Sequence, residues 1–525
     1  MNIEFPERFN MADYFLYHNV EAAGRDGKVC LYFEDERYTY GDAVRLSNRA
    51  GNALVRECGL RVEDRVLIVL PDCPEFAWTW FGASRAGGVI TMVNPLLPVA
   101  DYVYYLEYTR ARVAVIHESL LENFARAAEG SQHLRSVLVV GSEGGGFGGE
   151  RKNFHSFAEA AAAQPDELTP ADTHRDDIAI WLFTSGSTGH PKGAVHLQHD
   201  LPYNTECYAK GVLGVNENDL TVSVPKLFFG YATGTNLLFP FAAGGATALF
   251  PERSTPEKLF EVIERHRPTI LTSVPTMINA MLNVEGAAAK DISSLRMCLS
   301  AGEALPEELY RRWVERFGVE IYDGIGSAEM FHIYITNRPG DVKPGSLGRV
   351  VEGYEAEVVD AEGRGLPPGE MGTLRIKGDS AALCYWQAHE KSKQTFAGDW
   401  CTTGDQFHAD AEGYFWYHGR TDDMLKVSGV FVAPAEIENC LLRHEAVLEA
   451  AVVGHDAGDG LVKPRAFLVL REGHAPSEAL AQTLKDFVKS NLALYKYPRW
   501  VDFVDSLPKN DRGKIDRKQL KDSSQ

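Results

Sequence analysis

The chain has 525 residues and a formal net charge of −20, with 45% hydrophobic and 24% charged residues. This length exceeds what one hydrophobic core usually holds, so two or more domains are expected. The acidic excess argues against nucleic acid or an anionic membrane as the main partner. Its eight cysteines are scattered without a Cys-x-x-Cys pair, which favours reduced thiols over a zinc site or a disulfide framework.

The start of the chain lacks the basic segment and apolar run of a signal peptide. Apolar stretches are interrupted by Gly, Pro or charge well short of the about 18 residues that would span a bilayer. We therefore expect a cytoplasmic protein with no membrane and no nucleic-acid partner. The sequence does not fix the oligomeric state, and a homodimer is compatible with it.

Short apolar runs alternate with amphipathic segments through the first third of the chain. Such alternation predicts an α/β fold with mixed, largely parallel sheets. The expected strands are 66–70, 113–116, 137–140 and 178–183, and the expected helices are 40–58 and 74–86.

A Gly-x-Gly-x-x-Gly match lies at residues 144–149, after the strand that ends at Val140. The surrounding segment is of low complexity, and Arg151, Lys152 and Asn153 follow it in place of an amphipathic helix. A dinucleotide-binding turn needs that helix. We therefore predict a surface loop at 144–149 and no dinucleotide site.

Short strands and turns replace the earlier pattern from about residue 345, with strands expected at 354–359 and 372–377. They predict a small β-rich unit attached to the large domain. A new α/β pattern follows, with helices expected at 434–443 and 477–491 and a strand at 450–453. We place the boundary near Asp422, which gives a large N-terminal domain of residues 1–421 and a small α+β domain of residues 422–525.

A glycine- and hydroxyl-rich run at residues 184–193 follows the last expected strand of the first third. Its glycines allow positive φ and a close approach of backbone N–H groups to an anion. It is not the P-loop of the ATPases, which ends in Gly-Lys-Ser/Thr, because Pro191, Lys192 and Gly193 end it here. The residues predicted to bind phosphate are Thr184, Ser185, Gly186, Ser187, Thr188, Gly189 and Lys192.

Five further segments follow this run, at residues 300–306, 322–329, 400–405, 419–429 and 507–517. Together with it, they make the chain resemble an AMP-forming acyl- or aryl-CoA synthetase of the adenylate-forming superfamily over essentially its whole length. The resemblance implies ATP and coenzyme A as co-substrates and Mg²⁺ as cofactor. It also implies a mobile C-terminal domain.

The resemblance assigns most of these segments to ATP. The run at 184–193 wraps the β- and γ-phosphates, the segment 300–306 lies along adenine, and Asp405 binds the ribose hydroxyls. Glu329 and Thr188 match the positions that hold Mg²⁺. Besides that run, the residues implied to contact ATP or AMP are Gly302, Glu303, Ala304, Asp323, Gly324, Ser327, Asp405 and Arg420.

The segment 322–329 departs from the family's Tyr-Gly-x-Thr-Glu pattern. Ile325 stands where Tyr is usual, and Ala328 where a Thr bonds the α-phosphate. We expect that contact to come from Ser327 or from backbone N–H groups instead, with the activity retained.

The C-terminal segments imply a two-step reaction. Lys514 matches the lysine that bridges the carboxylate and the α-phosphate during adenylation, with Lys192, Glu329 and Thr188 as the other expected catalytic groups. The resemblance implies that the domain then rotates about Asp422 and withdraws that lysine. Gly429 matches a position that lines the tunnel through which coenzyme A reaches the acyl-AMP.

The expected acyl pocket is aromatic. Its predicted residues are Phe229, Gly230, Tyr231, Gly234 and His332. The segments 226–229, 324–333 and 419–429 together look most like the benzoate-CoA ligase branch. His332 is expected to bond either the substrate carboxylate or an ortho substituent, unless it is only a packed core histidine. Gly230 stands where that branch tends to have Ala, so we expect room for 2-aminobenzoate or 2-hydroxybenzoate.

The predicted function is therefore an aryl-CoA ligase that activates benzoate or 2-aminobenzoate with ATP. Two alternatives stay open. A stand-alone adenylation enzyme that loads an aryl acid onto a carrier protein shares nearly every segment. A medium-chain acyl-CoA ligase would need a longer acyl tunnel.

Overall fold

The structure is a computed structural model that describes residues 3–142, 153–184, 190–427, 430–456, 462–509 and 515–522. The glycine-rich stretch 144–149, the loop residues Ser185 to Gly189, Gly429 and Lys514 lie outside the described residues, as does the side chain of Asp422. All eight cysteines are free thiols, as expected from their spacing.

One sheet within the described ranges has eight strands, in the order β19-β9-β8-β4-β3-β5-β6-β7. The strands from β8 to β7 run parallel, whereas β9 and β19 are antiparallel to their neighbours. The four strands expected in the first third are β3, β5, β6 and β8. The bounds are β3 Arg65–Val69, β4 Val89–Met92, β5 Val113–His117, β6 Ser136–Val140, β7 Phe154–Ser156, β8 Ile178–Thr184, β9 Lys192–Leu197 and β19 Cys384–Tyr385.

A second sheet of the described chain has nine strands, in the order β16-β15-β14-β13-β12-β10-β11-β1-β2. Its centre, from β1 to β14, is parallel, and the outer strands are antiparallel. The bounds are β1 Val29–Phe33, β2 Glu36–Thr39, β10 Leu220–Ser223, β11 Ala246–Leu249, β12 Ile270–Ser273, β13 Met297–Ala301, β14 Ile321–Gly326, β15 Ile333–Thr336 and β16 Arg349–Val350.

The two helices expected early in the chain pack tightly against each other. Helix α2 (Tyr40–Arg56) begins with a capping box, in which Thr39 and Asp42 satisfy each other's backbone N–H groups. Helix α3 (Pro74–Arg85) has Pro74 in its first turn and is buried almost throughout. A Cβ at Gly82 would lie 2.4 Å from the carbonyl oxygen of Ser47, so glycine permits this close approach.

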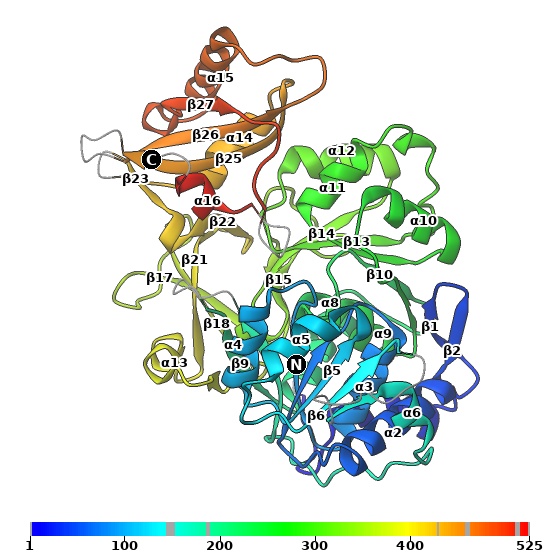
Figure 1. Ribbon diagram of the computed structural model, residues 1–525. Coiled ribbons are helices and arrows are strands. Elements are labelled where there is room, and N and C mark those ends of the chain that lie inside the picture. Colours follow the sequence, from blue (N-terminus) through cyan, green and yellow to red (C-terminus); the bar gives the residue numbers. More distant parts are fainter. Residues whose placement is uncertain are drawn as a thin grey trace.

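The remaining helices cover the sheets and the C-terminal region (Figure 1). Their bounds are α1 His18–Glu21, α4 Val99–Thr109, α5 Leu121–Ala128, α6 Phe157–Ala162, α7 Asp200–Asn204, α8 Gly230–Thr233, α9 Phe239–Ala243, α10 Pro256–His266, α11 Pro275–Leu282, α12 Glu307–Phe317, α13 His389–Thr395, α14 Pro434–Leu442, α15 Glu478–Asn491 and α16 Arg517–Asp522.

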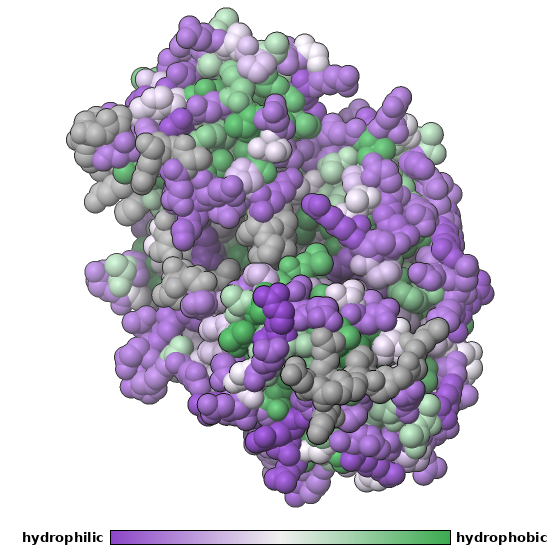
Figure 2. All heavy atoms as spheres, viewed as in Figure 1, coloured by the Kyte–Doolittle hydropathy of each residue, from purple (hydrophilic) through white to green (hydrophobic). Residues whose placement is uncertain are grey.

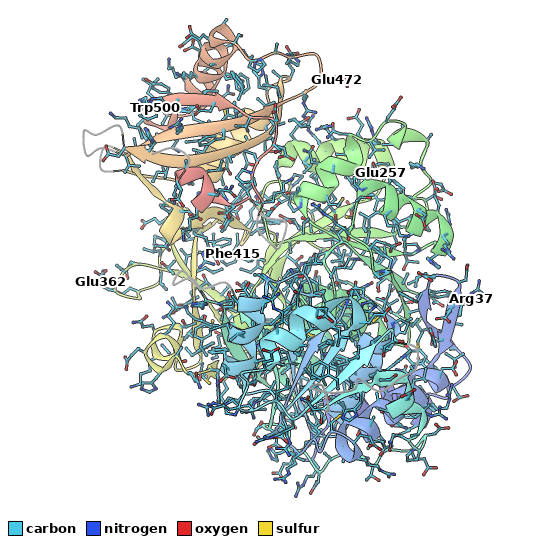
Figure 3. All side chains as sticks on the ribbon, in the orientation of Figure 1. Arg37, Glu257, Glu362, Phe415, Glu472 and Trp500 are labelled. Carbon is cyan, nitrogen blue, oxygen red and sulfur yellow. The ribbon has the colours of Figure 1, made fainter. Side chains whose placement is uncertain are left out.

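A smaller antiparallel sheet forms the β-rich unit expected after residue 345. Phe415, at the start of its last strand, lies between the C-terminal elements and the body below them (Figure 3). The strands are β17 Glu355–Val359, β18 Gly372–Lys377, β20 Phe396–Ala397, β21 Trp400–Ala409 and β22 Phe415–Arg420.

The elements after β22 form a separate layer at one end of the molecule (Figure 1). Helices α14 and α15 pack on a three-stranded sheet through a hydrophobic cluster of their own. The Asn279 side chain of α11 donates a hydrogen bond to the Leu448 carbonyl at 3.3 Å, which joins this layer to the body. The strands are β23 Leu425–Val427, β24 Val430–Val432, β25 Val447–Asp456, β26 Val462–Leu470 and β27 Trp500–Phe503.

Hydrophilic residues dominate the face of the molecule shown in Figure 2, and hydrophobic ones are scattered among them. Within the described ranges, no helix has the length and apolar character needed to cross a bilayer.

Candidate active site

The ends of the predicted phosphate loop are fixed by a β-hairpin. Strand β8 ends at Thr184 and β9 begins at Lys192, and these two residues are paired across the antiparallel ladder. The loop between them therefore leaves and re-enters the sheet at one point. Ser185, Gly186, Ser187, Thr188 and Gly189 lie outside the described residues, so their predicted contacts stay predictions.

Lys192 is partly buried beside an aromatic ring and a carboxylate. Its ammonium nitrogen lies 5.6 Å from the ring centroid of Tyr385. Burial, followed by the nearby charge of Lys391, lowers the pKa of Lys192, while Glu329 acts in the opposite direction. The hairpin thus places the Lys192 ammonium group directly after the predicted phosphate loop, where the sequence predicts a bound phosphate.

Glu329 and the preceding residue, Ala328, are held by contacts from two segments, 382–385 and β9. The hydroxyl of Tyr385 donates to its Oε1 at 2.6 Å, and the N–H of Ala382 donates to its carbonyl oxygen at 2.7 Å. Nε2 of the buried His196, on β9, lies 2.7 Å from the Ala328 carbonyl oxygen. The carboxylate therefore has a defined position close to Lys192.

One carboxylate suits Mg²⁺, which prefers oxygen ligands and keeps several waters when it binds with phosphates. The described residues contain no group of three or more His, Cys, Asp or Glu that would form a complete protein cage. A single carboxylate such as that of Glu329 suits an ion that arrives with a nucleotide, because phosphates and waters supply the other oxygen ligands. The assignment of Glu329 and Thr188 to Mg²⁺ remains a prediction.

A γ-turn separates Glu329 from His332. Its central residue, Phe331, has φ 66° and ψ −58°, and the N–H of His332 donates to the Met330 carbonyl at 2.8 Å. This conformation is rare and strained for a residue with a side chain. The turn reverses the chain between Glu329, which the sequence assigns to Mg²⁺, and His332, which it assigns to the acid. No residue type in the sequence signals this turn.

His332 lies in an aromatic box. Its ring centroid is 4.7 Å from that of Phe239, 5.2 Å from that of Tyr231 and 5.5 Å from that of Tyr208. Burial lowers the pKa of His332 to about 3, so the ring is neutral. A Cβ at Gly234 would lie 2.5 Å from His332 Cδ2, so only glycine permits this packing.

The hydrogen bonding of His332 fixes its tautomer. Nε2 lies 3.1 Å from the Tyr231 carbonyl oxygen, which only accepts, so we assign the ring proton to Nε2. Nδ1 is then an acceptor, and it is buried without a hydrogen-bond partner among the described residues. His332 is therefore packed as a core histidine would be. Its Nδ1 nevertheless remains available to accept a hydrogen bond.

The segment that carries Phe229 is anchored by a buried carboxylate that the sequence did not reveal. Asp72 Oδ1 accepts a hydrogen bond from the N–H of Leu227 at 2.8 Å, and Oδ2 lies 4.0 Å from Lys226 Nζ. Burial raises the pKa of Asp72 to about 6, against the opposing charge of Lys226. The rings of Phe228 and Phe229 contact each other just after this anchor, with centroids 4.4 Å apart and an interplanar angle of 50°.

Gly230 begins α8 after this aromatic pair. A Cβ there would lie 3.3 Å from Leu182 Cδ1 and 3.7 Å from the Phe331 carbonyl oxygen. An added methyl group would thus press on Leu182 at the end of β8. The space that glycine leaves at position 230 is therefore bordered by the Leu182 side chain. That side chain would have to shift if residue 230 were alanine.

Two of the segments predicted to bind the nucleotide, 300–306 and 322–329, lie next to each other. Strands β13 and β14 pair in parallel, with Ser300 opposite Asp323 and Ala301 opposite Gly324, so both segments leave the same sheet edge. Such carboxyl-terminal edges of parallel strands are common ligand sites. Gly302 turns away with φ 89°, and the residues on this edge that the sequence assigned to nucleotide are Gly302, Glu303, Ala304, Asp323, Gly324 and Ser327.

Asp323 has an unusual carboxyl group. It is buried, and one oxygen accepts from the N–H of Leu305 at 3.3 Å. Burial raises the pKa of Asp323 to about 8, so the group is largely protonated at neutral pH. It therefore offers a hydroxyl donor as well as an acceptor at this edge.

Asp405 and Arg420 face each other across the ladder of β21 and β22. Arg420 Nε lies 3.5 Å from Asp405 Oδ1. The predicted ribose and phosphate contacts are thus neighbours, immediately before the Thr421–Asp423 turn that contains the predicted hinge residue Asp422. The domain boundary at this turn stays a prediction.

Two family matches cover most of the chain. Residues 19–386 match the family described as AMP-binding enzyme, and residues 436–514 match the AMP-binding enzyme C-terminal domain. A benzoate–CoA ligase of Thauera aromatica is 45% identical over 99% of this chain and 97% of its own. An anthranilate–CoA ligase of Pseudomonas aeruginosa is 32% identical over 88% of this chain and 87% of its own.

Solved structures agree with these matches over the whole fold. The anthranilate CoA ligase AuaEII, in complex with anthranoyl-AMP, superimposes with a TM-score of 0.94 at 40% identity, covering 99% of this chain and 98% of that one. A benzoate CoA ligase from Burkholderia xenovorans LB400 has a TM-score of 0.89 at 43% identity, covering 98% of this chain and 100% of that one.

Proposed function

We propose that this protein, which belongs to the AMP-binding enzyme family and is an AMP-forming aryl-CoA ligase, activates a small aromatic acid with an ortho hydrogen-bond donor. The observation that carries the choice of acid is the neutral His332 in its aromatic box, whose Nδ1 has no hydrogen-bond partner in the part of the chain that the structure describes. Similarity to ligases named for benzoate and anthranilate supports it.

In the first step, the acid's carboxylate attacks the α-phosphorus of ATP and pyrophosphate leaves. Such displacements depend mainly on positioning and on neutralising charge. Lys192 stabilises the departing pyrophosphate, and Lys514 holds the carboxylate against the α-phosphate. Mg²⁺ on Glu329 and Thr188 supplies charge neutralisation when it is bound. In this arrangement the phosphates of ATP lie beside Lys192, at the start of β9. Adenine lies along segment 300–306, at the sheet edge formed by β13 and β14.

In the second step, the thiol of coenzyme A attacks the acyl carbon of the aryl-AMP and AMP leaves. A thiol has a pKa near 8.5 by analogy with cysteine, so a useful fraction is thiolate at neutral pH. Rotation about Asp422 removes Lys514 and admits the thiol past Gly429. One site then serves both reactions.

The protonation state of His332 favours one of its two expected roles. With Nε2 donating to the Tyr231 carbonyl and the ring neutral, Nδ1 has no proton to give. It therefore does not bond the substrate carboxylate, since both groups accept. It accepts instead from the amino group of 2-aminobenzoate or the hydroxyl of 2-hydroxybenzoate.

The direct test measures AMP release with ATP, Mg²⁺ and coenzyme A across a panel of acids. The panel contains benzoate, 2-aminobenzoate, 2-hydroxybenzoate, 4-aminobenzoate, acetate and octanoate. We expect the highest kcat/KM for an ortho-substituted acid, and a lower value for 4-aminobenzoate, which has the same group out of reach. Preference for octanoate would instead indicate the medium-chain ligase, and adenylate formation without thioester would indicate a carrier-protein enzyme.

Substitution of Gly230 tests the size of the acyl pocket. We expect Gly230→Ala to lower the ratio of kcat/KM for 2-aminobenzoate over benzoate, because the methyl group pushes Leu182 and narrows the space beside the ring. One methyl group is worth about 1 kcal/mol, or roughly fivefold. An unchanged ratio would show that Gly230 does not border the ortho position.

A further inference from the structure

Two tyrosines of α4 fix the backbone on both sides of Lys192. The hydroxyl of Tyr104 donates to the Pro191 carbonyl at 2.6 Å, and the hydroxyl of Tyr108 accepts from the N–H of Gly193 at 3.1 Å. Pro191 and Gly193 belong to the two peptide groups that flank Lys192. Neither tyrosine lies in the segments that carry the family resemblance, and both approach from a helix far back in the sequence.

The Tyr108 hydroxyl also reaches the strand that carries Tyr385. It donates to the Trp386 carbonyl at 2.7 Å, while the N–H of Trp386 donates to the Gly193 carbonyl at 2.9 Å. Tyr385, one residue earlier, lies beneath Lys192 and donates to Glu329. One hydroxyl therefore joins the strand of the lysine to the strand that holds the carboxylate.

The rings of the two tyrosines form a continuous stack along the hairpin exit. Tyr104 and Tyr108 are one helical turn apart, and their ring centroids are 5.2 Å apart at an interplanar angle of 15°. The ring of His190, the residue before Pro191, stacks on Tyr104 at 4.7 Å and 18°. Stacking restricts the rings, so each hydroxyl is presented in one place.

We propose that Tyr104 and Tyr108 are positioning residues for pyrophosphate departure, because they set the backbone from which Lys192 extends. This inference rests on the proposed function, in which Lys192 stabilises pyrophosphate. Both tyrosines act through Lys192 and do not touch the substrate. They therefore matter for the adenylation step and not for the thioester step, since pyrophosphate has left by then.

Tyr→Phe variants test this inference with little disturbance, because each keeps the ring and removes only the hydroxyl. The set comprises Tyr104→Phe, Tyr108→Phe and the double variant. Tyr102→Phe is the matched control, since its hydroxyl donates to the Pro95 carbonyl at 2.7 Å from the same helix, away from the hairpin. Lys192→Met serves as the reference for loss of the cation.

Two assays separate the steps. Acid-dependent exchange of pyrophosphate into ATP reports adenylation, with KM measured for ATP and for 2-aminobenzoate. Thioester formation from synthetic 2-aminobenzoyl-AMP and coenzyme A reports the second step alone. We expect the double variant to lose about tenfold in kcat/KM for ATP, as the three neutral hydrogen bonds of the two hydroxyls are lost. The KM for the acid and the thioester rate should match those of Tyr102→Phe.

The outcomes separate this inference from the proposed function. Impaired exchange in Lys192→Met with normal exchange in every tyrosine variant would overturn the inference and leave the proposed function intact. Two further results would also overturn it, because the hydroxyls would then be only structural. One is an equal loss of rate in pyrophosphate exchange and in thioester formation by the double variant. The other is a loss no larger than that of Tyr102→Phe. Normal exchange in Lys192→Met would contradict the role of Lys192 and the inference together.

Discussion

Asp323 shows how burial at one residue makes the stability of the protein depend on pH. Burial raises the pKa of its carboxyl group from 3.8 to about 8. The folded state thus holds the proton more tightly than the unfolded state. The stability that this group contributes is complete below about pH 4 and is lost as pH rises through about 8.

Replacing Asp323 by Asn tests this dependence, because the amide keeps the shape and does not ionise. The quantity to compare is the free energy of unfolding of Asp323→Asn minus that of the unsubstituted protein, measured by urea unfolding. We expect this difference to increase from pH 4 to about pH 8 and to stay constant above pH 8. Asp360→Asn is the control, since hydrogen bonding lowers the pKa of that half-buried carboxyl. Parallel pH profiles for Asp323→Asn and the unsubstituted protein would contradict a raised pKa.

At the scale of residues, the sequence named candidate site residues but not the contacts that hold them. Glu329, His332 and Lys192 were named from their segments. The positive φ of Phe331 was not predictable, because a bulky residue gives no local sign of a γ-turn. Asp72, Tyr104, Tyr108 and Tyr385 were missed because each contacts the site through the fold, across tens or hundreds of residues.

At the scale of elements, the π-helical turn η4 (Gly234–Leu238) packs its first residue against the hairpin of β14 and β15. A Cβ at Gly234 would lie 2.5 Å from His332 Cδ2 and 3.1 Å from Phe239. We expect Gly234→Ala to lower stability by about 1–3 kcal/mol. It should also raise the KM for the acid while leaving the KM for ATP unchanged, because His332 is displaced.

Thermal unfolding and steady-state kinetics check this expectation. Gly27→Ala is a suitable control, since a Cβ there meets nothing within 4 Å and its φ is not positive. Unchanged stability and acid KM in Gly234→Ala would mean that η4 does not set the place of His332.

The sequence predicted elements best where apolar runs were continuous. The buried parallel strands β3, β5, β6 and β8 were expected within two residues of their observed ends. The strand expected at 450–453 extends over Val447–Asp456, because Glu449 and the sequence Gly-His-Asp at 454–456 interrupt the apolar run on both sides of the buried centre. The short strands β11 and β12 contain Ala, Thr and Ser, which give little hydrophobic contrast, and they were not predicted.

At the scale of the whole molecule, the two steps are assigned to two placements of the C-terminal layer. We expect Lys514→Ala to lower the rate of aryl-AMP formation by about a hundredfold or more, since a charge close to the reacting atoms is lost. Thioester formation from added aryl-AMP should persist. Rapid-quench kinetics measure the rate of each step. An equal loss of rate in both steps would contradict the assignment of Lys514 to adenylation alone.

The most direct test of the central claim follows one turnover of 2-aminobenzoate with ATP, and adds coenzyme A only after the first phase. The account predicts that 2-aminobenzoyl-AMP accumulates with one pyrophosphate released. Addition of coenzyme A should then convert it to 2-aminobenzoyl-CoA with one AMP. Formation of ADP, or an adenylate that coenzyme A does not consume, would contradict the assignment as an AMP-forming aryl-CoA ligase.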